Sequence, residues 1–396
     1  MEYNHILIRF GELTTKGKNK KDFIRKLREN LKNALVNFPN IQVEAQHDRM
    51  FVILNGENAH EVCEVIKNVF GIYSFSLAKK CEKDIKVIAD IALDMMNQEE
   101  ENATFKVMAR RSDKSFPLTS DEINRAVATR ILVNTNHKVD VHTPDIKLQV
   151  EIRQDCAYVL SKVILGAGGY PVGVGGKAMV MLSGGIDSPV SCYLTMKRGI
   201  EIECVHYASP PYTSEQAQQK VLDLAEKLSR YQGKIKVHVV PFTDLQLEIY
   251  KHANEAYPIT IMRRMMYRIA QELANRNKCL AIVNGESVGQ VASQTLESMN
   301  TINSVVTMPV LRPVVTYDKL EIIDIAKKID TYDLSIQPFE DCCTIFTPKN
   351  PVTKPTIKKA ESFEHWNYEE MIEEAIRATR TIIVSPKKSN RDEDIF

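Results

Sequence analysis

Six residues constrain the fold of this chain more than any others. The segment Ser183-Gly-Gly-Ile-Asp-Ser188 follows the apolar run 178–182 and precedes a helical pattern with Val190 and Leu194. A strand, a tight glycine turn and a helix form the geometry of a phosphate cradle, because glycines let backbone N–H groups approach an anion and the helix N-terminus adds partial positive charge. The segment lacks the Lys-Ser/Thr ending of a Walker loop. The alternative is a helix-capping turn in an ordinary α/β domain.

The chain after this segment alternates between apolar runs and amphipathic patterns. Strands are predicted at 180–182, 203–207, 236–240 and 279–284. Helices are predicted at 188–198, 214–230, 245–256 and 261–275. Parallel strands joined by crossover helices form a doubly wound sheet, in which ligands lie at the carboxyl ends of the strands.

The N-terminal third shows a different, α+β order. Strands are predicted at 6–10, 41–45 and 50–54, and helices at 18–35 and 59–69, which is typical of a ferredoxin-like sandwich. Residues 1–32 contain nine Lys and Arg against four Asp and Glu. This surplus indicates either nucleic-acid contact or a solvated helix face.

A second small unit is predicted from about residue 75 to 165. Its helices are expected at 85–96 and 120–132, and its strands at 104–109, 149–153 and 157–164. Between the strand at 104–109 and the helix at 120–132 lies a loop with clustered cations and one aromatic ring. These residues can grip phosphates and stack on a base, or form a solvated loop whose ring packs inward. They are Arg110, Arg111, Lys114 and Phe116.

Two adjacent cysteines, Cys342 and Cys343, lie in a loop that ends at Pro348. Vicinal cysteines are uncommon as core packing, although buried structural thiols are the alternative. No further zinc ligands lie at suitable spacing. The chain has no Cys-x-x-Cys, so we expect no iron–sulfur cluster. The eight scattered cysteines suit a reducing, cytoplasmic setting, and no run of about 18 apolar residues predicts a membrane span.

These motifs together resemble a known family. The Ser183–Ser188 segment resembles the SGGxDS loop of the PP-loop ATP pyrophosphatases, and the stretch 106–130 resembles a THUMP RNA-binding domain. The order matches the tRNA 4-thiouridine synthetase (ThiI) family, in a short form without a rhodanese domain. The resemblance implies a ferredoxin-like domain at 1–58, a THUMP domain at 59–165, a glycine-rich linker at 166–176 and a PP-loop catalytic domain at 177–396.

The resemblance also implies an ATP site built from several segments. Arg263 is chosen there over Arg264, which is expected to be solvated, and the main chain at His206 and Tyr207 is expected to line the adenine. His206 receives no proton-transfer role. The implied ATP-binding residues are Met181, Leu182, Ser183, Gly184, Gly185, Asp187, Ser188, His206, Tyr207, Arg263, Gly285 and Gln294.

Four residues are expected to carry the chemistry. By the resemblance, Asp187 helps hold Mg²⁺ and pyrophosphate, and Lys319 stabilises the charge of the phosphoryl transfer. Asp318 can cap the helix that starts at Lys319. The family places a sulfur-handling cysteine in the late loop; we assign it to Cys342, with Cys343 as the resolving thiol.

The implied reaction converts uridine 8 of tRNA to 4-thiouridine with ATP and Mg²⁺. Expected partners are tRNA, a cysteine desulfurase as persulfide donor and a second copy of the chain in a homodimer; the sulfur carrier ThiS is a further partner that the residues leave open. No metal site built by the protein alone is expected. The implied RNA-binding residues are Lys18, Lys20, Lys21, Arg25, Arg110, Arg111, Lys114 and Phe116.

Two other functions compete with this one. A different PP-loop enzyme, such as a 2-thiouridylase or an ATP-dependent ligase, leaves the cationic loop at 110–120 unexplained. A non-catalytic RNA-binding protein leaves Asp187, Lys319 and the cysteine pair without a purpose. Pyrophosphate release separates the last function from the others, and the identity of the modified base separates the first two.

Overall fold

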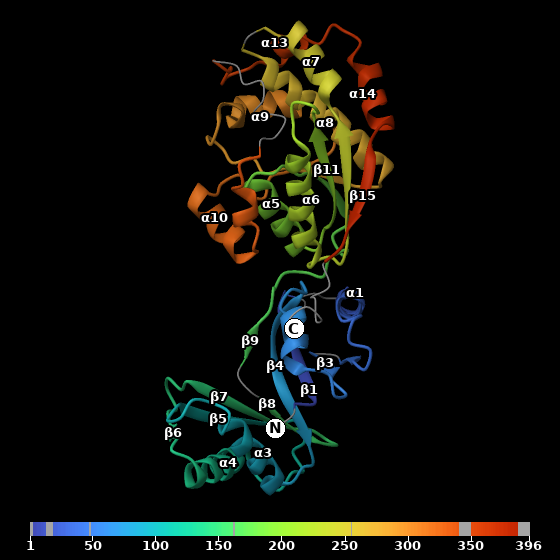
Figure 1. Cartoon of the computed structure of the whole chain (residues 1–396). Helices are drawn as coiled ribbons and strands as arrows, with labels where there is room; N and C mark the ends of the chain where they lie inside the picture. The colour runs from blue at the N-terminus through green and yellow to red at the C-terminus, as the bar shows by residue number, and fades with distance from the viewer. Residues whose placement is uncertain are drawn as a thin grey trace, which may run out of the picture. The chain divides into compact units, whose positions relative to one another are not determined.

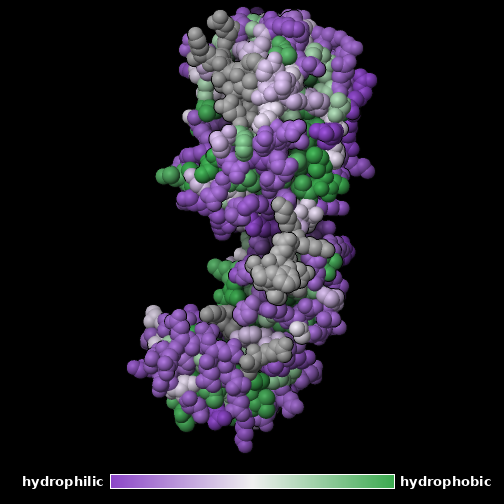
Figure 2. Space-filling view, viewed as in Figure 1, coloured by the Kyte–Doolittle hydropathy of each residue, from purple (hydrophilic) through white to green (hydrophobic). Residues whose placement is uncertain are grey.

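The chain forms two compact units, Met1–Pro171 and Val172–Phe396 (Figure 1). The structure is a computed structural model that describes residues 3–12, 19–46, 49–160, 163–254, 256–339 and 350–386. Each unit has its own sheet and its own hydrophobic cores. Figure 2 shows that hydrophilic residues cover most of the visible surface of each unit, with smaller hydrophobic patches between them.

In the described part of the first unit, nine strands form one sheet. Their order is β2-β3-β1-β4-β8-β7-β5-β6, and β9 pairs with β4. The strands are β1 (His5–Phe10), β2 (Gln42–Ala45), β3 (Arg49–Ile53), β4 (Ile72–Cys81), β5 (Thr104–Arg111), β6 (Lys138–Val139), β7 (Ile146–Ile152), β8 (Ala157–Leu160) and β9 (Ile164–Leu165). The helices are α1 (Lys20–Ala34), α2 (Ala59–Ile66), α3 (Ile85–Met96) and α4 (Ser120–Asn134).

The predicted α+β organisation of this unit is confirmed, but β4 and β6 were not predicted, and β8 and β9 were predicted as one strand. The ten-residue strand β4 lies at the centre of the sheet, pairs with β1 on one side and with β8 on the other, and so joins the two halves. Its alternating Ser74, Phe75, Ser76 and Leu77 are all buried. Burial of both faces at the middle of a sheet depends on the neighbouring strands, so the local pattern did not reveal it.

Two cores lie under the helices of this unit. Ile6 and Ile8 of β1 pack with Leu27 of α1 and Val62 of α2. A second core joins α3, α4 and the strands β5, β7 and β8. Since side chains alternate along a strand, Leu7 and Arg9 of β1 lie on the reverse face of the sheet.

In the described part of the second unit, six strands form the sheet β14-β13-β10-β11-β12-β15. All neighbours are parallel except the β12–β15 pair, which is antiparallel. The strands are β10 (Lys177–Met181), β11 (Glu201–Ala208), β12 (Ile235–Pro241), β13 (Ala281–Val283), β14 (Val310–Leu311) and β15 (Arg380–Val384). The helices are α5 (Asp187–Lys197), α6 (Glu215–Ser229), α7 (Thr243–His252), α8 (Pro258–Arg276), α9 (Leu296–Asn303), α10 (Lys319–Lys328), α11 (Tyr332–Ser335), α13 (Ile357–Glu361) and α14 (Tyr368–Arg377), with the short 3₁₀ helix η2 (Ala292–Gln294).

The predicted doubly wound parallel sheet is confirmed. The chain moves from β10 to β11 and β12 on one side, whereas β13 pairs with the other side of β10. The carboxyl ends of β10 and β13 therefore meet at a switch point of the strand order, where ligands bind in such sheets. The edge strands β14 and β15 were not predicted; each is short and lies far in sequence from the strand it pairs with.

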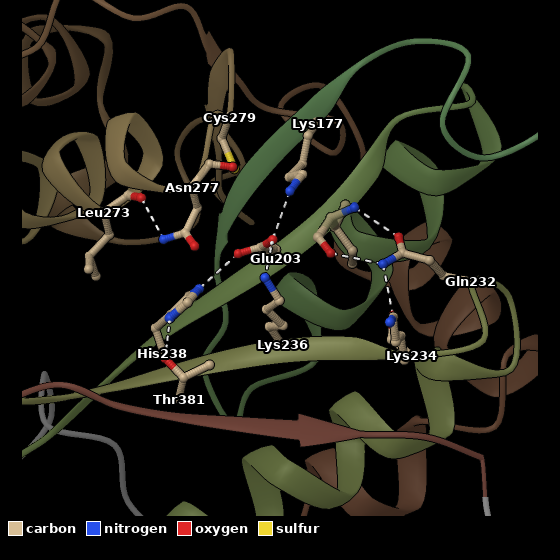
Figure 3. A network of polar contacts seen from close by, with 11 residues as sticks. Lys177, Glu203, Gln232, Lys234, Lys236, His238, Leu273, Asn277, Cys279 and Thr381 are labelled. Atoms are coloured by element: carbon tan, nitrogen blue, oxygen red, sulfur yellow. Dashed lines mark hydrogen bonds and ion pairs between the residues drawn. The ribbon is translucent and has the colours of Figure 1, made fainter.

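A buried carboxylate ties four strands together toward their amino ends (Figure 3). Glu203 of β11 is 2% exposed and accepts hydrogen bonds from Lys177 of β10 at 2.9 Å and Lys236 of β12 at 3.3 Å. His238 Nε2 lies 2.9 Å from the carboxylate, and His238 Nδ1 lies 2.9 Å from Thr381 Oγ1 on β15. Burial raises the pKa of Glu203, but these hydrogen bonds outweigh it and lower the pKa to about 2.

None of the helices in the described ranges combines the length and the apolar character that crossing a membrane requires.

Candidate active site

The Ser183–Ser188 loop closes on itself through two serine side chains. Ser183 N donates to Ser188 Oγ at 3.0 Å, and Ser188 Oγ donates back to Ser183 O at 3.1 Å. Gly185 N donates to Ser183 Oγ at 3.4 Å. Among the described residues no side chain caps the start of α5 at Ile186. A phosphate fits this position, because it can accept from N–H groups that a capping side chain usually satisfies.

Two of the predicted catalytic residues meet at this loop. Asp187 is the first residue of α5, and its Oδ1 lies 2.7 Å from Lys319 Nζ, at the first residue of α10. Gln290 Nε2 donates to the other carboxylate oxygen at 3.0 Å. Gln290 comes from the loop after β13, so three segments converge at the switch point. Gln290 is not among the site residues predicted from the sequence; its place after the predicted strand at 279–284 was the available signal.

The start of α10 is held by a capping box between Asp318 and Glu321. Asp318 Oδ1 accepts from Glu321 N at 2.9 Å, and Glu321 Oε2 accepts from Asp318 N at 2.9 Å. The capping role of Asp318 is therefore confirmed. Because the cap fixes the first turn of α10, it also fixes where the Lys319 side chain begins.

Gly285 permits close contact between the β13 loop and α5. A Cβ at this position would lie 2.7 Å from Ser188 N and 2.8 Å from Asp187 C, and both of these atoms are backbone. Gln294 closes the same loop, since its Oε1 accepts from Ser287 N at 3.3 Å and its main-chain oxygen accepts from Gly289 N at 3.0 Å. Nucleotide contact by Gly285 and Gln294 stays a prediction.

The same loop carries a buried acid, Glu286, that was not among the predicted site residues. Glu286 receives ion pairs from Arg263 at 2.5 Å and Arg312 at 2.6 Å, and a hydrogen bond from Asn284 at 2.8 Å. Burial raises the pKa of Glu286, while the charges of Arg263 and Arg312 outweigh it and hold the pKa below its usual value. Arg263 thus supports the loop after β13, and its predicted nucleotide contact stays a prediction.

The expectation that Arg264 is solvated is wrong. Its side chain is 1% exposed and forms two hydrogen bonds with Glu364, at 2.7 and 2.9 Å. Its Nη1 also donates to Thr301 O at 2.7 Å. Arg268, one turn further along α8, binds the same carboxylate. The segment that carries Glu364 covers this side of α8. The sequence around Arg264 does not predict this burial, because the partner lies 100 positions away.

Residues at the ends of β10 and β11 have mainly structural side chains. His206 is buried, with Nδ1 3.2 Å from Leu182 O, and Tyr207 donates to Met266 O at 2.5 Å. Leu182 N donates to Val205 O at 2.9 Å. The predicted contact of the main chain of His206 and Tyr207 with the adenine stays a prediction. Met181 and Leu182 lead directly into the Ser183–Ser188 loop.

The predicted sulfur-handling residues Cys342 and Cys343 lie outside the described residues. Two of the described cysteines are poorly suited to handling sulfur. Burial raises the pKa of both Cys63 and Cys279 to about 12, so these thiols stay protonated near neutral pH. The free cysteines in the described ranges are Cys63, Cys81, Cys156, Cys192, Cys204 and Cys279.

The predicted RNA-binding residues occupy two places in the first unit. Lys20, Lys21 and Arg25 lie on α1, where the exposed Arg25 pairs with Asp22 at 2.9 Å. Lys18 lies outside the described residues. Arg110 and Lys114 are exposed in and after β5.

Two residues of the cationic loop serve the fold. Arg111 Nη1 donates to Phe116 O at 3.1 Å and to Leu118 O at 2.8 Å, and so holds the loop closed. Phe116 is 7% exposed and packs in the core under α3 and α4. This burial agrees with the inward-packing alternative and argues against stacking of its ring on a base.

Arginines that sequence reasoning missed lie on the reverse face of the first unit's sheet. Arg9 donates to Gln149 at 2.9 Å, and Glu151 pairs with Arg49 at 2.5 Å and Arg153 at 3.0 Å. Arg110 lies opposite Glu151 in the β5–β7 register. Of these four arginines, Arg49 and Arg153 pair directly with Glu151, so the cluster has more cations than carboxylates and carries net positive charge. Their separation along the chain hid the cluster.

Comparison with protein families matches the whole order of domains. The ThiI ferredoxin-like domain matches residues 5–76, the THUMP domain matches 82–162, and the thiamine biosynthesis protein (ThiI) model matches 173–367. A protein of Geobacillus sp. (strain WCH70), described as "Probable tRNA sulfurtransferase", is 52% identical over 396 residues, covering 99% of each chain.

The chain belongs to the ThiI family.

Other ThiI relatives agree. A protein of Listeria monocytogenes serotype 4b (strain CLIP80459) with the same description is 51% identical over 399 residues, covering 100% of this chain and 99% of the relative. The crystal structure of a 4-thiouridine synthetase–RNA complex with bound ATP matches with a TM-score of 0.91 and 36% identity, over 97% of this chain and 100% of the other. PH1313 from Pyrococcus horikoshii Ot3 matches with a TM-score of 0.65 and 27% identity, over 83% and 99%.

Proposed function

We propose that this protein is an ATP-dependent tRNA sulfurtransferase that converts uridine 8 to 4-thiouridine and releases AMP and pyrophosphate. The observation that carries the proposal is the convergence of Asp187, Lys319 and Gln290 at the Ser183–Ser188 loop. ThiI relatives named as tRNA sulfurtransferases, and a similar structure that holds RNA and ATP, support the reaction and its substrates.

The first step activates the uridine oxygen. Expelling oxide from C4 is prohibitive, so O4 attacks the α-phosphorus of ATP; an O–P bond forms, the α–β phosphoanhydride bond breaks and pyrophosphate leaves. The uracil N3 proton passes to solvent. The loop N–H groups and the Lys319 ammonium stabilise the negative charge that develops on the phosphoryl oxygens, and they do so without reorganising.

The second step replaces oxygen by sulfur. The terminal sulfur of a Cys342 persulfide attacks C4, a C–S bond forms, and AMP leaves with the former uridine oxygen. The Cys343 thiolate then attacks the Cys342 sulfur, which breaks the S–S bond to the substrate and closes an enzyme disulfide. The sulfur stays on the uridine, which regains its N3 proton. An external dithiol reduces the enzyme disulfide before the next turnover.

Magnesium fits this site as a companion of ATP. Within the described ranges no group of three or more His, Cys, Asp and Glu side chains is placed to hold a metal ion. Mg²⁺ is commonly bound by one or two carboxylates together with substrate phosphates. Asp187 is the carboxylate that would hold it, and the ion would neutralise charge on the phosphates. An iron–sulfur cluster has no part in this proposal.

The proposal includes tRNA as substrate and a cysteine desulfurase as persulfide donor, in the cytoplasm. A homodimer and sulfur delivery to ThiS remain further proposals from the family resemblance. The basic reverse face of the sheet, with Arg9, Arg49, Arg110 and Arg153, supports phosphate contact by the first unit.

Mass spectrometry of nucleosides tests the reaction. The protein is incubated with unmodified tRNA, Mg²⁺-ATP, cysteine and a cysteine desulfurase, and 4-thiouridine that depends on both ATP and the desulfurase is the expected product. Pyrophosphate release without any thionucleoside would contradict the sulfur step, and 2-thiouridine would identify a different PP-loop enzyme. If neither pyrophosphate nor a thionucleoside forms, the result favours a non-catalytic RNA-binding protein.

A further inference from the structure

A buried lysine on α6 binds the last described residues before the Cys342 segment. Lys220 is 4% exposed. Its Nζ donates to three main-chain oxygens, of Ser335 at 3.4 Å, Gln337 at 3.1 Å and Phe339 at 3.1 Å. These acceptors belong to alternate residues, so one ammonium group holds the whole stretch 335–339.

Such contacts define the path of the chain closely. A buried ammonium is costly unless hydrogen bonds replace its water, so the three carbonyl oxygens must stay near Nζ. Carbonyl groups belong to the backbone, and holding them fixes the chain itself. Phe339 is the third residue before Cys342. Lys220 therefore fixes the point from which the chain enters the cysteine segment.

The same helix also holds the turn that links α10 to α11. Lys227, two turns after Lys220, pairs with Asp330 at 2.6 Å, and Arg230 donates to Ile329 O at 2.5 Å. Since α10 begins at Lys319 beside Asp187, α6 ties the residues before Cys342 to the helix that supplies a catalytic cation. Residues 335–339 and the helix that begins at Lys319 thus share one support.

We propose that Lys220 is a positioning residue for sulfur transfer, which acts by fixing residues 335–339 relative to α10. The inference rests on the proposed function of Cys342. Lys220 has no part in adenylation in this scheme, so the two half-reactions respond differently to its loss. Misplacing a reacting group by about 1 Å can cost on the order of 100-fold in rate.

The test compares Lys220→Met with a control, Lys251→Met, in the full-length protein. Both substitutions remove a lysine cation, but only the first releases residues 335–339, because Lys251 lies on α7 and pairs with Glu248. Single-turnover formation of 4-thiouridine is measured with unmodified tRNA, Mg²⁺-ATP, cysteine and a cysteine desulfurase. Pyrophosphate release and the KM for ATP are measured beside it.

For Lys220→Met we expect the thiolation rate to fall about 10- to 100-fold, with pyrophosphate release and the KM for ATP within about twofold of the unmodified protein. Lys251→Met should leave both rates within about twofold. Equal loss of both half-reactions in Lys220→Met, or full retention of thiolation, would overturn the inference.

Lys220→Arg keeps the test decisive if the methionine variant unfolds. Arginine retains N–H donors, so thiolation should be at least partly retained in this variant. If the arginine variant released pyrophosphate normally but formed no 4-thiouridine, a hydrogen-bonding role of Lys220 would be contradicted. Failure of the proposed function is distinguishable, because the unmodified protein would then form no 4-thiouridine. A wrong inference leaves that activity intact in the unmodified protein.

Discussion

Lys319 Nζ lies 2.7 Å from Oδ1 of Asp187, which joins the first residues of α10 and α5 across 132 positions of the chain. The pair places a cation beside the acid of the Ser183–Ser188 loop. Both side chains are partly exposed, so the contact is open to exchange for a phosphate. An ion pair between partly exposed groups contributes little stability, so in the proposed reaction its use is to hold the cation ready for the transferred phosphoryl group.

Replacing Lys319 by methionine should lower the rate of tRNA-dependent pyrophosphate release by about 100-fold with little change in the KM for ATP. The reason is that a preorganised cation acts mainly on charge that develops in the transition state. Steady-state kinetics of pyrophosphate release measure it. Lys328→Met, on an exposed position at the other end of α10, is the control. Near-normal release in Lys319→Met would remove this residue from the mechanism.

A methyl group at Gly285 should disrupt the site without touching a charged residue. Gly285→Ala would place Cβ within 3 Å of the α5 backbone, so the β13 loop must move away from Ser188. We expect weaker ATP binding by about tenfold or more, because the loop and the phosphate cradle no longer fit together. Isothermal titration with ATP reports the change. Unaltered affinity would show that the two segments separate freely.

Glu203→Gln should lower the free energy of unfolding near pH 7 by on the order of 3 kcal/mol, given a folded pKa of about 2 against the ordinary 4.5. Because the folded pKa is depressed, the stabilisation is complete above the ordinary pKa and is lost as the pH falls from about 5 toward 2. Urea unfolding at several pH values measures this dependence.

Glu201→Gln, on the same strand, is the matched control and should change stability little. If Glu203→Gln kept the same acid dependence as the unmodified protein between pH 5 and 2, the assigned depression of the pKa would be wrong.

Removing the acid shared by Arg264 and Arg268 should be costly. Glu364→Gln leaves the nearly inaccessible guanidinium of Arg264 without its counter-charge, and breaking a buried ion pair from one side typically costs about 3–5 kcal/mol. Chemical denaturation of the whole protein tests the expectation. If Glu364→Gln lowered the free energy of unfolding by less than about 1 kcal/mol, water would have to reach Arg264 in the variant.

Substitutions at Arg110 and Phe116 should have different effects on tRNA binding. Arg110→Ala should weaken tRNA binding and reduce its salt dependence by about one phosphate contact. Phe116→Leu keeps an apolar side chain in the core and should leave tRNA affinity unchanged, because the ring is buried. Filter binding at several salt concentrations measures both. Strong loss of affinity in a folded Phe116→Leu protein would restore a stacking role.

The sequence alone determined the features that depend on neighbours along the chain. The predicted helix at 85–96 agrees with α3, the phosphate loop lies between β10 and α5 as expected, and Asp318 caps α10. Hydrophobic periodicity, glycine turns and capping boxes act within a few residues, so they can be seen in a single sequence. The order of the domains came from the resemblance to the ThiI family.

Only the tertiary structure decided which distant residues meet. It joined Asp187 to Lys319, buried Arg264 against Glu364 and brought Arg9 to Gln149 across 140 positions. It also placed β4 at the centre of one sheet and β15 at the edge of the other. A local pattern reports whether a side chain favours burial or solvent, but the partner that satisfies a buried charge comes from elsewhere in the chain. Long-range pairing therefore set the chemistry of the site.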